Sequence, residues 1–338
     1  MTRSRHTNDG EAMTQTRPDT MQAAVIDRFG GIETLTLRAL PLPELRPDQI
    51  LLRVEVAGVG AWDRDEREGR YADYLGATKF PYVLGWDAAG TVAAVGAHVS
   101  RFREGDRVYV ASIPKQNGGG FYAEYAAVKA DDAAHVPPEL TIEQAGVMGW
   151  DVLTALAGVD DVLGVRPGES LMVFGASGGV GHMAVQLAKR MGARVLAVAS
   201  GDDGVALARR LGADAVVDGR RHDVIAAARE LAPGGLDASL VTAGGAATDR
   251  ALAAVRDGGR IAYPNGVRPK PSARPGVSLR SYDAIRGPEA TTKLHGLIAS
   301  GPFEVHVARA FPLVQIAAAH RALEEHHLGK LALRPSGR

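Results

Sequence analysis

The chain has 338 residues, 46% of them hydrophobic, and its 39 Lys and Arg residues balance 39 Asp and Glu residues. This length accommodates two domains with separate cores, and the zero net charge argues against nucleic acid or a membrane surface as the main partner. No apolar run approaches the ~20 residues that cross a bilayer, and the absence of cysteine excludes disulfides and thiolate metal sites, so we expect a soluble, cytoplasmic protein.

The first 20 residues are polar and contain no apolar core, so they do not resemble a secretory signal. We expect residues 1–20 to be a disordered leader, with Met21 as an alternative start. Short β-type runs punctuated by Gly and Pro follow, as far as residue 128. Alternation of apolar and polar residues over 49–57 and 105–111 predicts strands of a mostly antiparallel, barrel-like domain.

Residues 171–181, LMVFGASGGVG, place four glycines between an apolar run and an alanine-rich amphipathic segment. A strand that turns sharply into a helix through such glycines brings backbone N–H groups and the positive end of the helix dipole close to an anion. The spacing is G-x-x-G-x-x-G, with Ala176 where the commonest fingerprint has its first glycine. The turn is therefore predicted to bind the pyrophosphate of a dinucleotide, through Ala176, Ser177, Gly178, Gly179, Val180 and Gly181.

Beyond this turn, apolar runs at 194–199, 215–218, 237–244 and 258–266 alternate with helical patterns. This is the order of βαβ units in a parallel sheet that is covered on both faces. Ligands of such sheets lie at the carboxyl ends of the strands. We therefore expect the residues at the ends of the last two runs to face the cofactor, namely Ala243, Gly244, Pro264, Asn265 and Gly266.

Helical patterns return at 288–300 and 313–327, and the chain ends on a strand-like segment at 330–335. The C-terminal tail is therefore expected to complete the first domain. The predicted fold is α/β, with a Rossmann-type doubly wound parallel sheet inserted into the mostly antiparallel domain. The predicted boundaries are 146–285 for the dinucleotide-binding domain, and 21–145 with 286–338 for the discontinuous domain.

Several motifs occur together in the order typical of one family. They are FPYVLGWDAAGTV at 80–92, GDRV at 105–108, GGGFYAEYAAV at 118–128, the glycine turn, and LGAD at 211–214. The chain thereby resembles the medium-chain dehydrogenase/reductase superfamily, and within it the zinc-independent, quinone oxidoreductase-like branch, over residues 21–333. The resemblance implies a GroES-like first domain and hydride transfer from a nicotinamide cofactor to a quinone or an α,β-unsaturated carbonyl.

The zinc enzymes of this superfamily need a cysteine and a histidine as catalytic ligands. Here AGVGAWD at 57–63 occupies the place of the first ligand, and the chain has no cysteine. The ten histidines show no ligand spacing, and His320, His326 and His327 are expected to be solvated on a surface helix. We therefore predict that the protein binds no metal.

The resemblance assigns roles to four residues near the hydride path. Thr154 matches a threonine beside the nicotinamide, and Lys330 matches a family element that closes on the cofactor. Tyr71 aligns with a tyrosine of the active site, and its phenol is suited to donate to a developing oxygen anion. Asp63 is retained from the family pattern G-V-N-x-x-D, whereas Gly60 replaces the asparagine. Tyr71, Asp63 and Thr154 are therefore the predicted catalytic residues.

Trp62, Tyr74 and Trp86 are candidates for an apolar wall beside a planar acceptor, with ordinary core positions as the alternative for each. Asp87 is interpreted as a structural carboxylate that orders neighbouring backbone. No residue stands out as an obligatory general base, so solvent is expected to supply the proton.

The segment after the second parallel strand bears on the choice between NADPH and NADH. Ser200 is typical of NADP sites, whereas an acid there would bind the ribose of NAD. The lysine of NADPH-using relatives corresponds to Gly204, and Asp202 and Asp203 would repel a phosphate. We expect NADPH, with NADH as the alternative.

Two other functions stay open. The protein is alternatively an enoyl-thioester reductase of a fatty-acyl or polyketide pathway, or a protein that binds NADPH without catalysis. Residues 277–283 are a candidate edge strand for pairing in a homodimer.

Overall fold

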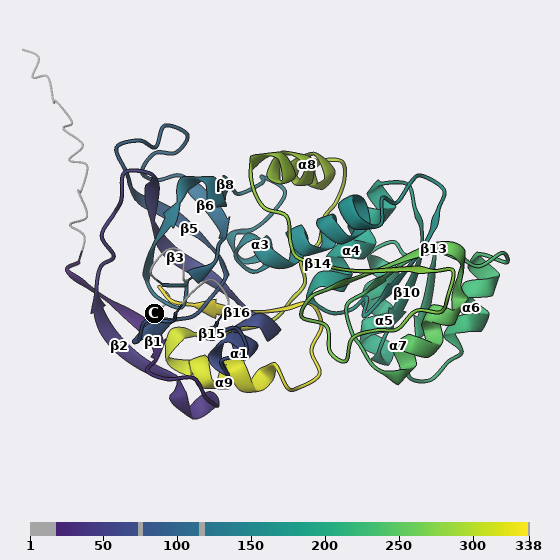
Figure 1. Ribbon diagram of the computed structural model, residues 1–338. Coiled ribbons are helices and arrows are strands. Elements are labelled where there is room, and N and C mark those ends of the chain that lie inside the picture. Colours follow the sequence, from purple (N-terminus) through teal and green to yellow (C-terminus); the bar gives the residue numbers. More distant parts are fainter. Residues whose placement is uncertain (1–17, 74–76, 115–118, 337–338) are drawn as a thin grey trace, which may run out of the picture.

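The computed structural model describes residues 18–73, 77–114 and 119–336 (Figure 1). Nearly all of the predicted leader, residues 1–20, lies outside them, although Thr20 already begins the first strand. Figure 1 shows antiparallel sheets in one lobe, the parallel sheet in the other, and helices α3 and α8 between them. No helix of the described residues is long and apolar enough to cross a membrane.

The larger antiparallel sheet combines strands from both ends of the chain. Its order is β15 (Val307–Pro312), β16 (Lys330–Arg334), β3 (Gln49–Val59), β5 (Asp87–Val95), β6 (Arg107–Ala111) and β8 (Ala133–His135), with β7 (Tyr125–Lys129) also paired to β3. Among the described strands of this sheet, β15 and β16 pair in parallel and the other pairs are antiparallel. The smaller sheet, which shares its apolar core, is β2 (Thr36–Pro41), β1 (Thr20–Ile26) and β4 (Tyr82–Val83). The C-terminal tail thus completes the first domain.

The second lobe is built on a six-stranded parallel sheet. Its order is β11 (Ala215–Asp218), β10 (Arg194–Ala199), β9 (Ser170–Phe174), β12 (Leu236–Val241), β13 (Val255–Pro264) and β14 (Ser278–Tyr282). The chain starts at β9 in the centre, runs outward to β11 and returns to β12, which confirms the doubly wound fold and places its switch point between β9 and β12. β14 is an edge strand, and the homodimer through it stays a prediction.

Alternate residues of β9 enter two different apolar cores, Leu171 and Val173 on one face and Met172 on the other. Both faces of the parallel sheet are therefore buried, which explains why its strands are apolar runs. The helices that follow its strands are α4 (Gly179–Arg190), α5 (Gly201–Arg210), α6 (Val224–Leu231) and α7 (Ala246–Ala251). The other α-helices with bounds among the described residues are α1 (Ala61–Arg67), α3 (Ile142–Leu156), α8 (Pro288–Ala299) and α9 (Ile316–Ala322).

Helix α3 fixes the two lobes against each other. Thr141 begins it with a capping box, accepting from the Gln144 N–H at 3.2 Å. Its side chains, Met148 and Leu156 among them, belong to a core that also contains residues of both large sheets. Because the lobes share this core, the walls of any cavity between them are held in place.

One histidine does not lie where the sequence indicates. His320 is 1% exposed, and its ring packs edge-on against Tyr122 with 5.8 Å between centroids. Its Nδ1 lies 3.0 Å from Arg67 Nη1. The prediction of a solvated His320 is therefore wrong, because the residue shares the inner face of α9 with Ile316. Helix α9 also ends at Ala322, before the other two predicted histidines.

Candidate active site

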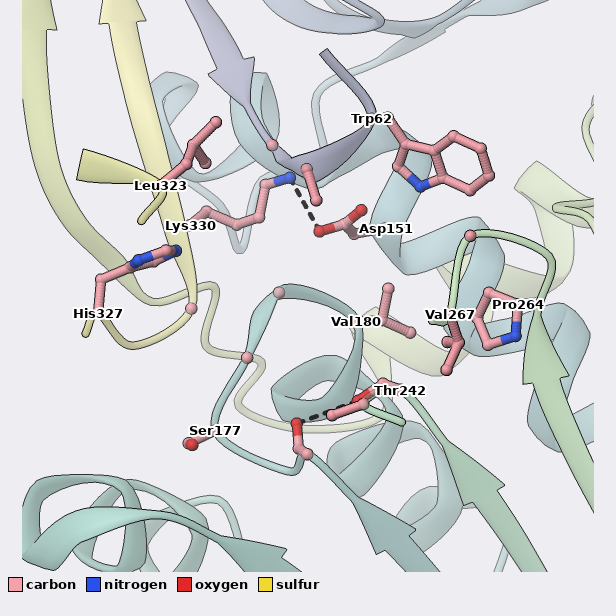
Figure 2. A pocket seen from close by; sticks show the side chains of 18 of the residues that line it. Trp62, Asp151, Ser177, Val180, Thr242, Pro264, Val267, Leu323, His327 and Lys330 are labelled. Carbon is pink, nitrogen blue, oxygen red and sulfur yellow. Dashed lines mark hydrogen bonds and ion pairs between the residues drawn. The ribbon is translucent and has the colours of Figure 1, made fainter. Parts of the chain in front are cut away.

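A cavity of about 520 Å³ lies at the carboxyl ends of the parallel strands, beside the antiparallel lobe. Figure 2 shows Trp62, Asp151 and Lys330 on one side of it, and Ser177 and Thr242 on the other. Open α/β sheets bind their ligands at this edge, near the switch point. The cavity is therefore where the predicted site residues should meet.

The glycine turn forms the wall at the start of α4. Four of its six predicted residues line the cavity, namely Ser177, Gly178, Gly179 and Val180. Ala176 and Gly181 are buried behind this wall, and a Cβ on Gly181 would come within 2.1 Å of the Gly175 carbonyl oxygen. No described side chain caps α4, so the first N–H groups of the helix stay available to a ligand. A pyrophosphate fits these donors and this end of the helix dipole.

His182, which sequence reasoning missed, supports the turn from behind. Its Nε2 accepts from the His306 N–H at 3.2 Å, which leaves the proton on Nδ1 to be donated to the Gly178 carbonyl at 2.9 Å. Burial lowers the pKa of His182 to about 4, so the ring stays neutral. The Gly329 N–H also donates to the Ser177 carbonyl, at 2.8 Å. The C-terminal tail therefore holds the turn at two points.

The strand ends place only some of their predicted residues at the cavity. Those that line it are Ala243, Pro264 and Gly266. Gly244 instead lies against the Pro269 carbonyl oxygen, where a Cβ would approach to 2.0 Å, and Asn265 is exposed. Thr242, not predicted, lines the cavity and donates to the Phe174 carbonyl at 2.9 Å, which joins the ends of β12 and β9.

The end of the cavity near β10 and β11 bears on cofactor choice. Ser200 and Arg220 both line it, and Arg220 follows β11. Sequence reasoning missed Arg220, although the rule of carboxyl strand ends applies to it as well. Asp203 has a side-chain partner, because His326 Nε2 lies 3.0 Å from its Oδ2. This bond lowers the pKa of Asp203.

Gly204 lies against the glycine turn, where a Cβ would come within 3.0 Å of Ser177 Oγ. Any side chain at this position would therefore require Ser177 to shift by a few tenths of an ångström. Asp202 pairs with Arg221 at 2.7 Å on the surface.

Aromatic rings line the opposite end of the cavity. Trp62 stacks on Tyr71 with 5.2 Å between centroids, and Trp86 meets Trp150 edge-on at 4.8 Å. All four rings line the cavity. Burial, with the nearby charge of Asp65, raises the pKa of Tyr71 to about 12, so its phenol keeps its proton at neutral pH. Flat apolar rings of this kind suit a planar ligand.

Asp63 and Lys330 also reach the cavity, but both are engaged within the protein. Asp63 Oδ2 accepts from the Gly60 N–H at 2.8 Å and so caps α1. Lys330 is buried, and its Nζ donates to Asp151 Oδ2 at 2.8 Å. Their roles toward a ligand therefore depend on these partners.

Thr154 lies one turn farther along α3 than Asp151, and its hydroxyl donates to the Trp150 carbonyl at 2.8 Å. The structure does not bring this hydroxyl into the described cavity lining. Tyr74, a candidate for the aromatic wall, lies outside the described residues.

Two family models match the chain on either side of this cavity. Residues 46–138 match the alcohol dehydrogenase GroES-like domain, and residues 179–275 match a model described as zinc-binding dehydrogenase. A curated relative, the quinone oxidoreductase of Sus scrofa, is 37% identical over 187 residues, which are 54% of each chain. The matched region therefore spans about half the length of that relative.

Solved structures are similar over nearly the whole chain. An alcohol dehydrogenase superfamily protein from Novosphingobium aromaticivorans is 30% identical with a TM-score of 0.82, over 93% of this chain and 99% of that one. A mycobacterial protein solved in complex with NADPH is 29% identical with a TM-score of 0.81, over 93% of this chain and 100% of that one. The chain belongs to the medium-chain dehydrogenase/reductase superfamily and is quinone oxidoreductase-like.

Proposed function

We propose that the protein is a zinc-independent reductase that uses NADPH to reduce a quinone or an α,β-unsaturated carbonyl. The observation that carries the proposal is one cavity that joins the glycine turn to the four aromatic rings. A nicotinamide cofactor, when bound, supplies the hydride. The chain's own residues hold the pyrophosphate, orient a planar acceptor against the rings and restrict water. The quinone oxidoreductase relatives support this substrate class.

The surroundings of Ser200 favour NADPH over NADH. Arg220 lines the same end of the cavity and offers a guanidinium suited to a phosphate. Asp203 is the nearby acid that would repel that phosphate, and its pairing with His326 offsets the repulsion. The mycobacterial relative solved with NADPH supports the same choice.

The donor set at the cavity favours a reaction without zinc. The segment AGVGAWD at 57–63 stands where the zinc enzymes carry their first ligand, and the chain has no cysteine. The Lys330 ammonium lies near Asp151, Asp87 and Asp63, and it already pairs with Asp151. Hydride acceptors that are already polarised do not require a Lewis acid.

The test follows the absorbance of NADPH with a panel of quinones, enones and an enoyl thioester, with NADH in parallel. We expect turnover with quinones or enones and a preference for NADPH. Turnover confined to the thioester identifies the enoyl-thioester reductase. Tight NADPH binding without turnover on any acceptor identifies a binding protein and contradicts the proposal.

A further inference from the structure

One lysine and three aspartates form a buried cluster where the cavity meets the antiparallel sheet. Lys330 begins β16, Asp87 begins β5, Asp63 lies in α1 and Asp151 lies in α3. Each is at most 8% exposed, and each lines the cavity. The dashed line in Figure 2 marks the Lys330–Asp151 pair, with 2.8 Å between Nζ and Oδ2. Charged side chains are seldom buried this deeply without a compensating role.

Missing side chains make room for the cluster. A Cβ on Gly60 would lie 3.5 Å from Lys330 Nζ and 3.8 Å from Asp63 Oδ2, so the ammonium and the carboxyl border the space beside this glycine. A Cβ on Gly179 would come within 2.2 Å of Asp151 Oδ2. Gly60 is the position where relatives carry the asparagine. The Lys330 ammonium therefore lies beside the position from which the asparagine side chain of the relatives would extend.

The charges of the cluster do not balance if every group is ionised. Burial alone would lower the pKa of Lys330, but Asp151 and Asp87 raise it, so Lys330 keeps its proton beside Asp151. Burial raises the pKa of Asp87 to about 7, with Asp151 adding to the shift and Lys330 opposing it. Burial, and then the charge of Asp87, raises the pKa of Asp63. Near neutral pH the cluster therefore holds exchangeable protons on its carboxyl groups.

Among the described residues, Glu66, Tyr82, Tyr122 and His182 are further titratable groups that face the cluster. The Glu66 carboxyl group accepts from the Tyr82 hydroxyl at 2.7 Å and from Trp86 Nε1 at 2.6 Å. Asp63 Oδ1 and the Tyr122 hydroxyl are buried and make no hydrogen bond of normal geometry within the described part of the chain. The Tyr122 hydroxyl faces the Asp63 carboxyl, and burial raises the pKa of both groups, which favours the neutral carboxyl.

We propose that Lys330 is the catalytic acid of the site, that Asp151 positions it, and that Asp87 returns the proton to it. The Lys330 ammonium donates to the negative oxygen that the acceptor gains on reduction. This inference rests on the proposed function, since it assigns the proton that the reduction requires. It also replaces solvent as the immediate proton donor.

The step balances in atoms and electrons. Hydride addition to a quinone or an enone places an electron pair on the acceptor oxygen, and one proton must follow. An N–H bond of Lys330 breaks as the O–H bond forms, which leaves a neutral amine that is disfavoured because Asp151 and Asp87 raise the pKa of Lys330. The carboxyl proton of Asp87 then passes to the amine, and solvent reprotonates Asp87. Hydride and proton together complete a two-electron reduction.

Lys330→Met combined with Asp151→Asn removes the pair without leaving a lone buried charge. We expect kcat to fall about 100-fold to 1,000-fold, as for the loss of a donor to an oxyanion, with the Kd for NADPH within about threefold of the wild type. The matched control is Lys189→Met with Asp214→Asn, because Lys189 pairs with Asp214 at 2.7 Å near the surface. An unchanged kcat in the Lys330 variant, or a loss confined to NADPH affinity, overturns the proposal.

Lys330→Arg separates acid catalysis from charge alone. The guanidinium keeps a positive charge opposite Asp151, but it does not release a proton. We expect a kcat about 100-fold below the wild type, again with NADPH bound normally. Wild-type kcat in this variant would show that Lys330 acts by charge and would refute the proton transfer.

Asp87→Asn supplies a readout that needs no turnover. In an infrared titration of the ligand-free wild type, a protonated carboxyl band should disappear with a midpoint at a pH of about 7, and the variant should lack it. If the wild type lacks this band, the proposed transfer of a proton from Asp87 to Lys330 is refuted. If the wild type oxidises no reduced nicotinamide with any acceptor, the proposed function fails. If it turns over and the Lys330 variants match it, only the present inference fails.

Discussion

Gly178 and Gly181 lie in the same turn, but a side chain at each is expected to have a different effect. At Gly178 it should weaken cofactor binding, and at Gly181 it should lower the stability of the fold. A Cβ on Gly178 meets only the Gly175 carbonyl oxygen, at the ordinary distance of 3.5 Å, and the φ of −83° suits any residue. Gly178→Val therefore leaves the fold intact, within about 0.5 kcal/mol of wild-type stability. A Cβ on Gly181 would overlap the same oxygen at 2.1 Å. Gly181→Ala therefore destabilises the protein by about 1–3 kcal/mol.

The added valine at Gly178 instead acts on the ligand. Its side chain covers the backbone N–H groups that are expected to donate to the pyrophosphate. The loss of two charge-assisted hydrogen bonds, at about 1.5 kcal/mol each, would reduce the binding free energy by about 3 kcal/mol. This corresponds to a loss of roughly 100-fold in NADPH affinity.

Isothermal titration calorimetry with NADPH and thermal unfolding in the same buffer give both quantities for each variant. Gly178→Ala serves as an intermediate control. The phosphate-binding assignment is refuted if Gly178→Val binds NADPH as the wild type does. The packing argument is refuted if Gly181→Ala unfolds at the wild-type temperature.

Three further predictions concern the two ends of the cavity and the buried histidine. Arg220→Ala should weaken NADPH binding about tenfold and leave NADH unchanged, as measured by cofactor fluorescence; equal effects on both cofactors would contradict a phosphate contact. Tyr71→Ala should raise the KM for a quinone about tenfold, because a stacked ring is lost. Tyr71→Phe keeps the ring, so its KM should stay unchanged and its kcat should fall less than tenfold. A greater loss of kcat in Tyr71→Phe would identify the phenol, and not Lys330, as the acid. Burial and the Arg67 charge lower the pKa of His320 to about 3, so the unfolded chain takes up this proton first as the pH falls below about 6.5. Relative to His320→Gln, the wild type should therefore lose about 1.4 kcal/mol of unfolding free energy per pH unit between pH 6 and pH 4, as measured by urea titration; parallel pH curves would contradict a buried neutral ring.

Local sequence patterns were sufficient for most of the parallel sheet. The runs predicted at 194–199 and 215–218 coincide with β10 and β11 at both ends. The glycine turn is also a local feature, because its spacing by itself predicts a strand, a backbone that can approach a phosphate closely, and the start of a helix. These features depend on neighbours within a few residues, and such neighbours are visible in a sequence.

Contacts between distant segments were not predictable in this way. The rule that ligands lie at the carboxyl ends of parallel strands applies to Arg220 as well as to Asn265. Only the structure shows that Arg220 lines the cavity and that Asn265 is exposed. The pattern of α9 shows an apolar face without showing what covers it. For that reason His320 was expected in solvent although Arg67 and Tyr122 enclose it.

The sequence by itself determined the family, the doubly wound fold and the place of the phosphate turn, since each rests on short-range patterns in a characteristic order. Only the tertiary structure decided the chemistry at the other end of the cavity. Lys330 and Asp151 are 179 residues apart, and they meet because β16 returns to β3 beside α3. Burial and charge coupling then set the protonation of Asp87, and both depend on which distant segments exclude water from it.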